Sequence, residues 1–314
     1  MSSKKKITFL SGGTGTPKLL LGFKEIIPNE QLVIIGNIGD DEEFYGLLVS
    51  PDIDTLLYLF SNQLDLNKFW GLNDEKFTNM KQLSLFGEKT WFQLGDKDLA
   101  LHLLRNKLLI SGKSYTEIIF EISKRLNIEV RILPFSNDKV RTKMITISNE
   151  CLSFQEYTVK HKEKAVIKSV LYEGSKKANL THEVKDGLMN SAAIIIGPSN
   201  PITSIGPMLA LNRFTKLLSM TKAKIIAVSP IAGDKAFSGP AIKLMKELNI
   251  IPNAYGIAHM YRKFLDTIFI SESDEGLSKK IEKLGINVIY ANISLKTKEE
   301  RVQLAERILQ EIKI

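Results

Sequence analysis

Carboxylate and amide side chains cluster in two short segments of this sequence. Asn37, Asp40 and Asp41 follow one apolar run, and Asp52 and Asp54 open a second segment a few residues later. Carboxylates beside a bound phosphate are typical of Mg²⁺ sites, because this ion prefers oxygen ligands and bridges carboxylates to substrate phosphates. One of them could instead accept the proton of an attacking hydroxyl. Helix capping and turn formation are the alternative interpretations.

A glycine-rich segment, Gly12–Thr16, directly follows Ser11 and the apolar run 7–10. Glycines let backbone N–H groups approach an oxyanion, and a helix beginning near Pro17 would point its positive end at the same place. The spacing is neither that of the dinucleotide fingerprint nor that of a Walker A loop. The segment predicts phosphate or nucleotide binding after the first strand, and a tight turn with packing glycines is the alternative.

A second polar loop, 197–207, follows the apolar run 192–196. Its prolines fix the backbone, while Ser199, Asn200 and Thr203 offer hydrogen bonds. A rigid polar loop at a strand end suits a nucleotide base or a phosphate, and a purely structural turn is the alternative.

Residues 95–102 resemble the start of a helix, with Asp96 as the expected cap. Lys97 and His102 would then be available to face a ligand. Plain capping beside a partly buried histidine is the alternative interpretation.

Short apolar runs alternate with helical segments, which predicts an α/β fold with a parallel sheet buried on both faces. We predict one doubly wound, mostly parallel, Rossmann-like sheet within a single domain, 1–314. Residues 55–127 are predicted as a mostly helical insertion that covers the ligand end of the sheet. The expected strands of the sheet are 7–10, 32–35, 129–134, 192–196, 224–228, 265–270 and 286–291, with hairpin or edge strands over 143–148, 151–160 and 165–172.

In such a sheet, ligands bind at the carboxyl ends of the strands, at the switch point in strand order. The loops 11–16, 36–41, 197–203 and 229–239 each follow an expected strand end. Parallel strands would bring all four to one rim. This convergence is stronger evidence for a site than any of the loops alone.

Composition excludes several classes of protein. The net charge is +8, but the lysines are dispersed and form no arginine-rich or aromatic-interleaved tract, so we expect no nucleic-acid partner. A single cysteine, Cys151, cannot form an internal disulfide, and no apolar run approaches the roughly 18–20 residues of a membrane span. We expect a cytoplasmic protein with small-molecule substrates.

Together these segments resemble the 2-phospho-L-lactate transferase family, which acts late in the biosynthesis of coenzyme F420. The resemblance implies a Mg²⁺-dependent transferase. A guanosine diphosphate ester of lactate, or of a related acid such as phosphoenolpyruvate, donates its phospholactyl group to the ribityl hydroxyl of the deazaflavin Fo, and GMP leaves. The matching stretches, in family order, are 11–20, 37–41, 50–58, 95–98, 197–207 and 238–241.

The resemblance also implies roles for residues at the matching positions. Asp54 would contact Fo or its hydroxyl, and Asp40 and Asp41 would be metal ligands or the base. Trp70 would stack on the flat deazaflavin ring. Lys97 stands where family members often have arginine, and lysine keeps the charge without the two-pronged donor geometry. The residues implied to hold the diphosphate are Gly12, Gly13, Thr14, Gly15 and Thr16, and those implied to bind the guanosine side are Ser199, Asn200 and Thr203. Asn37 is a further predicted binding residue.

A nucleotide-sugar-binding regulator of similar fold, without catalytic activity, is the competing hypothesis, because the same glycine-rich loop would serve both. Asp52, Asp54 and the aromatic insertion favour the enzyme, since a sensor has less need of them. A dinucleotide oxidoreductase is disfavoured by the glycine spacing. The sequence leaves open the donor acid and the oligomeric state, and a homodimer in which a second subunit covers the site is compatible with it.

Overall fold

A seven-stranded sheet forms the centre of the computed structural model, which describes residues 5–237 and 239–312. Ser238, part of one stretch in the resemblance above, lies outside the described residues. All neighbouring strands are parallel, in the order β14-β13-β10-β9-β1-β2-β5. The strands are β1 (Ile7–Ser11), β2 (Leu32–Gly36), β5 (Arg131–Pro134), β9 (Ala193–Ile196), β10 (Lys224–Val228), β13 (Thr267–Ile270) and β14 (Asn287–Tyr290).

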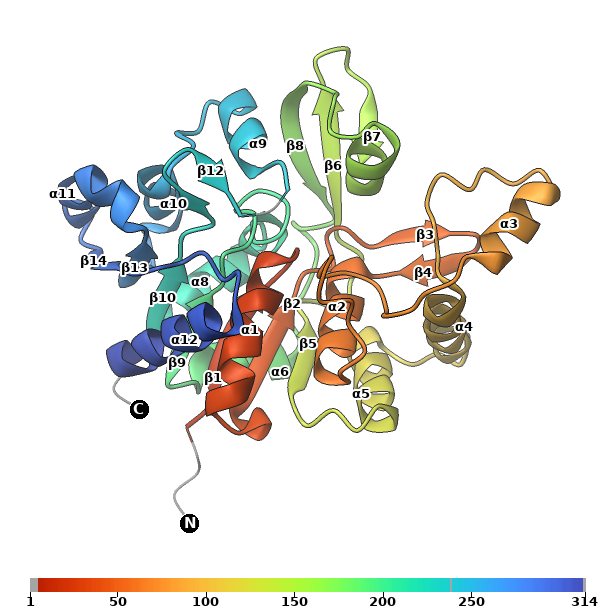
Figure 1. The fold of residues 1–314 in the computed structure, drawn as a ribbon, viewed down its shortest axis with the longest axis horizontal. Helices are drawn as coiled ribbons and strands as arrows, with labels where there is room; N and C mark the ends of the chain where they lie inside the picture. The colour runs from red at the N-terminus through yellow and green to blue at the C-terminus, as the bar shows by residue number, and fades with distance from the viewer. Residues whose placement is uncertain (1–4, 238, 313–314) are drawn as a thin grey trace.

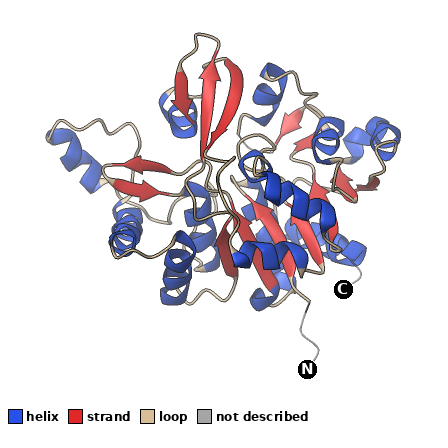
Figure 2. Cartoon of the chain, turned by 180° about the vertical axis from the view of Figure 1, so that it is seen from behind, coloured by secondary structure: helices blue, strands red, loops and turns tan. Residues whose placement is uncertain are grey.

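Helices cover both faces of this sheet, so the predicted doubly wound fold is confirmed (Figures 1 and 2). Strands β1, β2 and β9 are buried along their whole lengths, as expected for strands between two helical layers. In Figure 1, α1 and α12 lie in front of the sheet, and α6 and α8 lie behind it. The helices outside the insertion are α1 (Gly15–Ile26), α6 (His182–Met189), α7 (Gly206–Leu209), α8 (Asn212–Met220), α9 (Ala241–Glu247), α10 (Ala254–Tyr261), α11 (Ser278–Glu282) and α12 (Lys298–Ile312), with short 3₁₀ turns at Asn29–Gln31 and Glu272–Leu277.

The order of the strands places a switch point between β1 and β9. From β1 the chain moves outward to β2 and β5, and it then returns to the other side of β1 as β9. Ile7 is in register with both Leu32 of β2 and Ala193 of β9. The carboxyl ends of these three central strands therefore lie at one edge of the sheet, where ligands bind in folds of this kind.

The segment after β2 contains a hairpin that the sequence pattern did not predict, formed by β3 (Glu42–Phe44) and β4 (Leu47–Val49). Figure 1 shows this hairpin and α3 projecting to one side of the sheet. A second small core forms there, in which Phe44 stacks on Phe92 with ring centroids 3.8 Å apart. The helices of this region are α2 (Pro51–Phe60), α3 (Thr78–Leu85), α4 (Asp96–Ile110) and α5 (Tyr115–Arg125).

A three-stranded antiparallel sheet, in the order β7-β6-β8, rises beside the ligand edge (Figure 1). Its strands are β6 (Arg141–Thr146), β7 (Cys151–Ser153) and β8 (Ile167–Glu173), and a further hairpin joins β11 (Ile231–Ala232) to β12 (Lys235–Ala236). The expected strand over 151–160 is wrong beyond Ser153, because Glu156–Lys160 forms a π-helical turn. Ser153 and Glu156 exchange side-chain to backbone hydrogen bonds of 3.0 Å, which start the helical turn.

The expectation that Asp96 caps its own helix is also wrong. The N-cap position of α4 is Gly95, and the Asp96 carboxylate accepts hydrogen bonds from the N–H groups of Thr78 and Asn79 at the start of α3. Glu75 instead accepts from the backbone N–H groups at the start of α4. Asp96, the first residue of α4, thus caps α3, and Glu75, which precedes α3, caps α4. Both caps require the two helix starts to lie close together.

Helix α12, which packs on α1, begins with a capping box that predicts an acid-sensitive contribution to stability. Glu300 accepts from the N–H groups of Thr297 and Lys296, and its own N–H donates to the Thr297 hydroxyl. The Ser294 hydroxyl and these N–H groups lower the pKa of Glu300 to about 2. Because the folded-state pKa is depressed, this stabilisation is complete above the unfolded pKa near 4.5 and disappears as the pH falls toward 2.

We expect Glu300→Gln to lower the free energy of unfolding by about 1 kcal/mol at pH 7, a value limited by the exposure of the side chain. The difference from wild type should shrink at pH 3, and urea unfolding at the two pH values measures it. Glu306→Gln, on the exposed side of the same helix, is the control. An equal difference at both pH values would contradict the role of the charged carboxylate.

Candidate functional site

The loops that follow β1 and β9 are joined by hydrogen bonds at the switch point. The Ser199 hydroxyl donates to the carbonyl oxygen of Gly12 at 2.5 Å and lies 2.6 Å from the Thr16 hydroxyl. The Gly12 N–H lies 3.4 Å from the same Ser199 oxygen. The glycine-rich segment and the polar loop, more than 180 residues apart in sequence, therefore form one continuous rim.

Close packing explains two of the glycines in this rim. A Cβ atom on Gly15 would lie 1.9 Å from the carbonyl oxygen of Pro198, and one on Gly12 would lie 2.6 Å from Cβ of Ser204. Gly13 has φ +61°, which side-chain-bearing residues rarely adopt. Helix α1 begins at Gly15, so its N-terminal end faces the rim. This arrangement suits an anion, because the N–H groups of a first helical turn and the helix dipole both favour negative charge there.

A carboxylate of the protein already lies beside this helix end. Oδ1 of Asp52 accepts from the N–H of Gly13 at 2.8 Å, and Asn37 donates its side-chain amide to Oδ2 at 2.8 Å. Asn37 also lies within hydrogen-bond distance of Asp40 at 3.2 Å and of the carbonyl oxygen of Thr203 at 3.2 Å. Asn37 thus connects the loops after β2 and β9 with the first turn of α2.

Burial makes the two carboxylates of this cluster, Asp40 and Asp52, harder to ionise. Loss of hydration raises the pKa of Asp52 to about 6, although the Asn37 and Gly13 hydrogen bonds oppose the shift. Burial and the neighbouring Asp52 charge raise the pKa of Asp40 well above its usual range. A cation bound beside these two carboxylates would favour their charged forms, so the pair fits a cation site. Within 5–237 and 239–312, however, no three His, Cys, Asp or Glu side chains form a group that could hold a metal alone.

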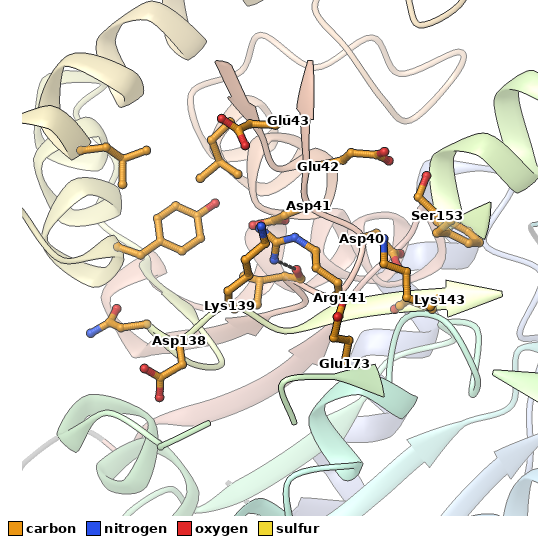
Figure 3. Close-up of a pocket in the computed structure, with 18 of the residues that line it drawn as sticks. Asp40, Asp41, Glu42, Glu43, Asp138, Lys139, Arg141, Lys143, Ser153 and Glu173 are labelled. Carbon is orange, nitrogen blue, oxygen red and sulfur yellow. Dashed lines mark hydrogen bonds between the residues drawn. The ribbon is translucent and has the colours of Figure 1, made fainter. Parts of the chain in front are cut away.

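Asp41, the neighbour of Asp40, has different partners. Its Oδ1 accepts from the Ser50 hydroxyl at 2.6 Å, and burial raises the pKa of Asp41 to about 7. Both aspartates line a cavity of about 500 Å³ that also carries basic side chains. Figure 3 shows Asp40 and Asp41 among the basic side chains of Arg141 and Lys143, with Arg141 donating to a backbone carbonyl, that of Ile38.

Asp54, two residues after Asp52 in the first turn of α2, belongs to a separate buried network. Its Oδ2 accepts from the backbone N–H of Ser50 at 3.2 Å and from Nη1 of Arg105 at 3.1 Å, while Nη2 of Arg105 contacts Oδ1. His102 lies between Nη1 of Arg105, at 3.1 Å, and Oδ2 of Asp98, at 3.2 Å. Burial alone would raise the pKa of Asp98, but His102 and the Tyr58 hydroxyl, which donates to it, lower it below its usual value.

An apolar cavity of about 360 Å³ opens onto this network. Trp70, which is 57% exposed, lines it together with Asp54, so the structure places these two predicted residues at one cavity. Lys97 does not line it, and its ammonium group donates to the carbonyl oxygen of Asn73 at 2.8 Å. The aromatic residues of the wall are Tyr58, Trp70, Phe77, Trp91 and Phe92.

The polar loop after β9 holds two buried atoms with no hydrogen-bond partner in the described chain. They are the side-chain nitrogen of Asn200 and the hydroxyl oxygen of Thr203. The Asn200 oxygen, in contrast, accepts from the N–H of Ile202 at 2.9 Å, which fixes the amide. Buried polar groups without a partner are rare, and a ligand is one way to satisfy them.

Arg105, Asp98 and Tyr58 are site residues that sequence reasoning did not single out. A signal existed for two of them, because Asp98, His102 and Arg105 are spaced i, i+4 and i+7 and therefore share one face of a helix. Nothing in the sequence indicated that Asp54 of a different helix would meet that face.

A doubly wound parallel sheet with a glycine-rich helix start at its switch point defines a Rossmann-like α/β protein. More narrowly, the chain belongs to the 2-phospho-L-lactate transferase CofD family, whose model matches residues 7–308. It is 40% identical over 300 residues to the 2-phospho-L-lactate transferase of Methanosarcina barkeri, covering 95% of this chain and 96% of the relative. It is also 40% identical over 308 residues to that of Methanococcus maripaludis strain S2, covering 97% and 98%.

A structural comparison supports the fold independently. The crystal structure of protein BH3568 from Bacillus halodurans, a member of the UPF0052 family, matches with a TM-score of 0.65 and 18% identity, covering 98% of this chain and 100% of that one. Among residues 5–237 and 239–312, none of the helices combines the length and the hydropathy that a membrane span needs.

Proposed function

We propose that this chain transfers a phospholactyl or phosphoenolpyruvyl group from a GDP-activated donor to the ribityl hydroxyl of the deazaflavin Fo, releasing GMP. Membership of the 2-phospho-L-lactate transferase family supports the reaction class. One geometric observation carries the proposal for the site. Asp52 accepts from the N–H of Gly13 at the rim formed by the loops after β1 and β9, and Asp54, two residues further on α2, lines the aromatic cavity. A donor and an acceptor bound at these two places would meet at the first turn of α2.

On the donor side, backbone N–H groups of Gly12–Thr16 and the start of α1 are proposed to bind the diphosphate. The unpartnered atoms of Asn200 and Thr203, with the hydroxyl of Ser199, would bind the guanosine side. Asp40, with Asp52 beside it, is the proposed site for Mg²⁺, and Asp41 remains a predicted ligand. Bound there, the ion would supply positive charge to the phosphate oxygens, and the phosphates would complete its coordination.

On the acceptor side, the aromatic wall suits a flat heterocycle, and Asp54 would accept a hydrogen bond from the attacking hydroxyl. Phosphoryl transfer passes through a loose transition state, so it demands mainly orientation and charge from the protein. Asp54 meets this demand because its carboxylate is fixed by Arg105 and by the N–H of Ser50. A nucleophilic side chain is not required.

GMP release tests the proposal directly. Purified protein with Fo, Mg²⁺ and the lactyl or enolpyruvyl GDP ester should release GMP in proportion to Fo consumed. A chain that releases no GMP with either donor, and that instead binds a UDP-sugar tightly without affinity for Fo in isothermal titration, would be the regulator of the competing hypothesis.

Replacing Trp70 with alanine should weaken Fo binding about tenfold, because stacking on one aromatic side chain contributes about 1–3 kcal/mol. Quenching of Fo fluorescence measures the affinity, and GDP affinity should not change. Phe86→Ala is the matched control, since Phe86 is an exposed aromatic residue of the same insertion that does not line the cavity. Equal effects of the two substitutions would contradict the stacking role.

A further inference from the structure

Three acidic residues, Asp54, Asp98 and Glu75, line the aromatic cavity and are called here its acidic floor. Asp54 and Asp98 both line the cavity, and they come from different helices, α2 and α4. Arg105, whose side chain has no exposed surface and does not line the cavity, contacts both oxygens of Asp54. His102, equally buried, contacts both Arg105 and Asp98. The two carboxylates are therefore parts of one unit.

The charges of this floor do not cancel. Asp54, Asp98 and Glu75 line the cavity, whereas Arg105, which contacts Asp54, does not line it. Lys68 also lines the cavity, but its ammonium group lies 3.2 Å from Asp65 and 5.2 Å from the centre of the Trp70 ring. An approaching ligand thus meets an apolar aromatic wall and a negative floor.

We infer that Arg105 is a positioning residue that fixes Asp54, and that the paired carboxylates of Asp54 and Asp98 restrict the cavity to acceptors whose side chain ends in a neutral hydroxyl. The inference rests on the proposed function and concerns the choice of acceptor. A hydroxyl can donate a hydrogen bond to a fixed carboxylate, whereas a phosphate monoester at the same place would meet like charge at close range. Like-charge contacts are strong determinants of specificity because they penalise the wrong ligand.

The same floor bears on product release. Transfer converts the acceptor's neutral hydroxyl into a phosphodiester that carries the added acid's carboxylate. The product therefore brings new negative charge to the end that had faced Asp54 and Asp98. Repulsion between these charges weakens product binding relative to acceptor binding, which keeps the cavity available for the next acceptor.

Competition between two deazaflavins tests the inference. Fo and the same compound with its chain ending in a phosphate monoester are titrated separately against the protein, with fluorescence quenching as the readout. Wild type should prefer Fo by at least about tenfold. Asp98→Asn and Arg105→Lys should each narrow this preference severalfold, whereas Asp74→Asn, the same amide substitution at an exposed aspartate of the insertion, should leave it unchanged.

Because Arg105 positions Asp54, its substitution should also lower the rate of transfer. Arg105→Lys should lower kcat about tenfold with GDP affinity unchanged, and Arg105→Met should lower it further, because lysine restores the charge but not the two-pronged contact. Circular dichroism checks that each variant is folded. Where Arg105→Met fails to fold, the Asp98→Asn and Arg105→Lys proteins still test the inference.

The outcomes distinguish failure of this inference from failure of the proposed function. A wild-type protein that releases GMP and binds both deazaflavins equally overturns this inference and leaves the proposed function standing. Unchanged preference in folded Asp98→Asn and Arg105→Lys proteins overturns it as well. A wild-type protein with no affinity for Fo overturns the proposed function and this inference together.

Discussion

Asp54→Asn should lower the rate of group transfer at least about 100-fold while changing GDP affinity by no more than about threefold. Asp54 lines the aromatic cavity, whereas the glycine N–H groups and the loop after β9 form the proposed nucleotide site. Asparagine keeps the shape of the side chain but removes the charge, and its amide would present a donor to the Arg105 guanidinium. The hydroxyl of the acceptor would then lose a fixed anionic partner.

Single-turnover GMP release gives the rate of transfer, and isothermal titration with GDP gives the affinity. Asp74→Asn serves again as the matched control, because it makes the same chemical change at an exposed position of the insertion. Equal losses of rate and of GDP affinity would assign Asp54 to nucleotide binding or to stability. Wild-type turnover would remove it from the reaction.

Gly15→Ala should reduce GDP affinity by at least about thirtyfold. The new methyl group would lie 1.9 Å from the Pro198 carbonyl oxygen, which is backbone and cannot rotate away. Relief of this overlap requires the loops after β1 and β9 to separate, and overpacking of this kind costs about 1–3 kcal/mol or more. Separation would displace both the start of α1 and the Ser199 contacts to Gly12 and Thr16.

Gly276→Ala is the control for this substitution, because a Cβ there meets no atom within 4 Å and the residue does not have a positive φ. Titration with GDP and thermal unfolding should be measured together. Loss of GDP affinity in a folded Gly15→Ala protein supports a nucleotide site at the junction of the two loops. Unchanged affinity would place the nucleotide elsewhere.

Helix α2 links the two halves of the site in a simple way. Its first turn carries Asp52 toward the glycine N–H groups and Asp54 toward the aromatic cavity, while its apolar residues are buried in the main core. The relative placement of the two carboxylates is therefore set by the helix geometry and by the core behind it. Substitutions in that core should disturb the proposed donor and acceptor sites together.

The parallel sheet was predictable because its strands are buried on both faces. Runs such as 32–35 and 193–196 are apolar throughout, and this pattern differs from that of a half-exposed strand. The β3–β4 hairpin was not predictable in the same way. Its strands are three residues each, too short for a periodic pattern, and Phe44 and Val49 are buried in a small cluster built mainly from residues 77–99.

The expected cap at Asp96 failed for a related reason. A carboxylate at a helix start is a local signal, but the local sequence does not say which helix it serves. Here the approach of α3 and α4 allowed Asp96 and Glu75 to cap the neighbouring helix starts. Local hydrogen-bonding preferences identify the residues that cap helices, whereas tertiary packing decides their partners.

The sequence by itself determined the type of sheet, the glycine-rich turn and the polar loop, since each depends on patterns within a few residues of chain. It also contained the resemblance to the transferase family. Only the tertiary structure decided that Arg105 meets Asp54, that Ser199 donates to Gly12, and that Trp70 shares a cavity with Asp54. These are contacts between distant segments, and their geometry depends on how whole helices pack rather than on the residues that lie next to them in the chain.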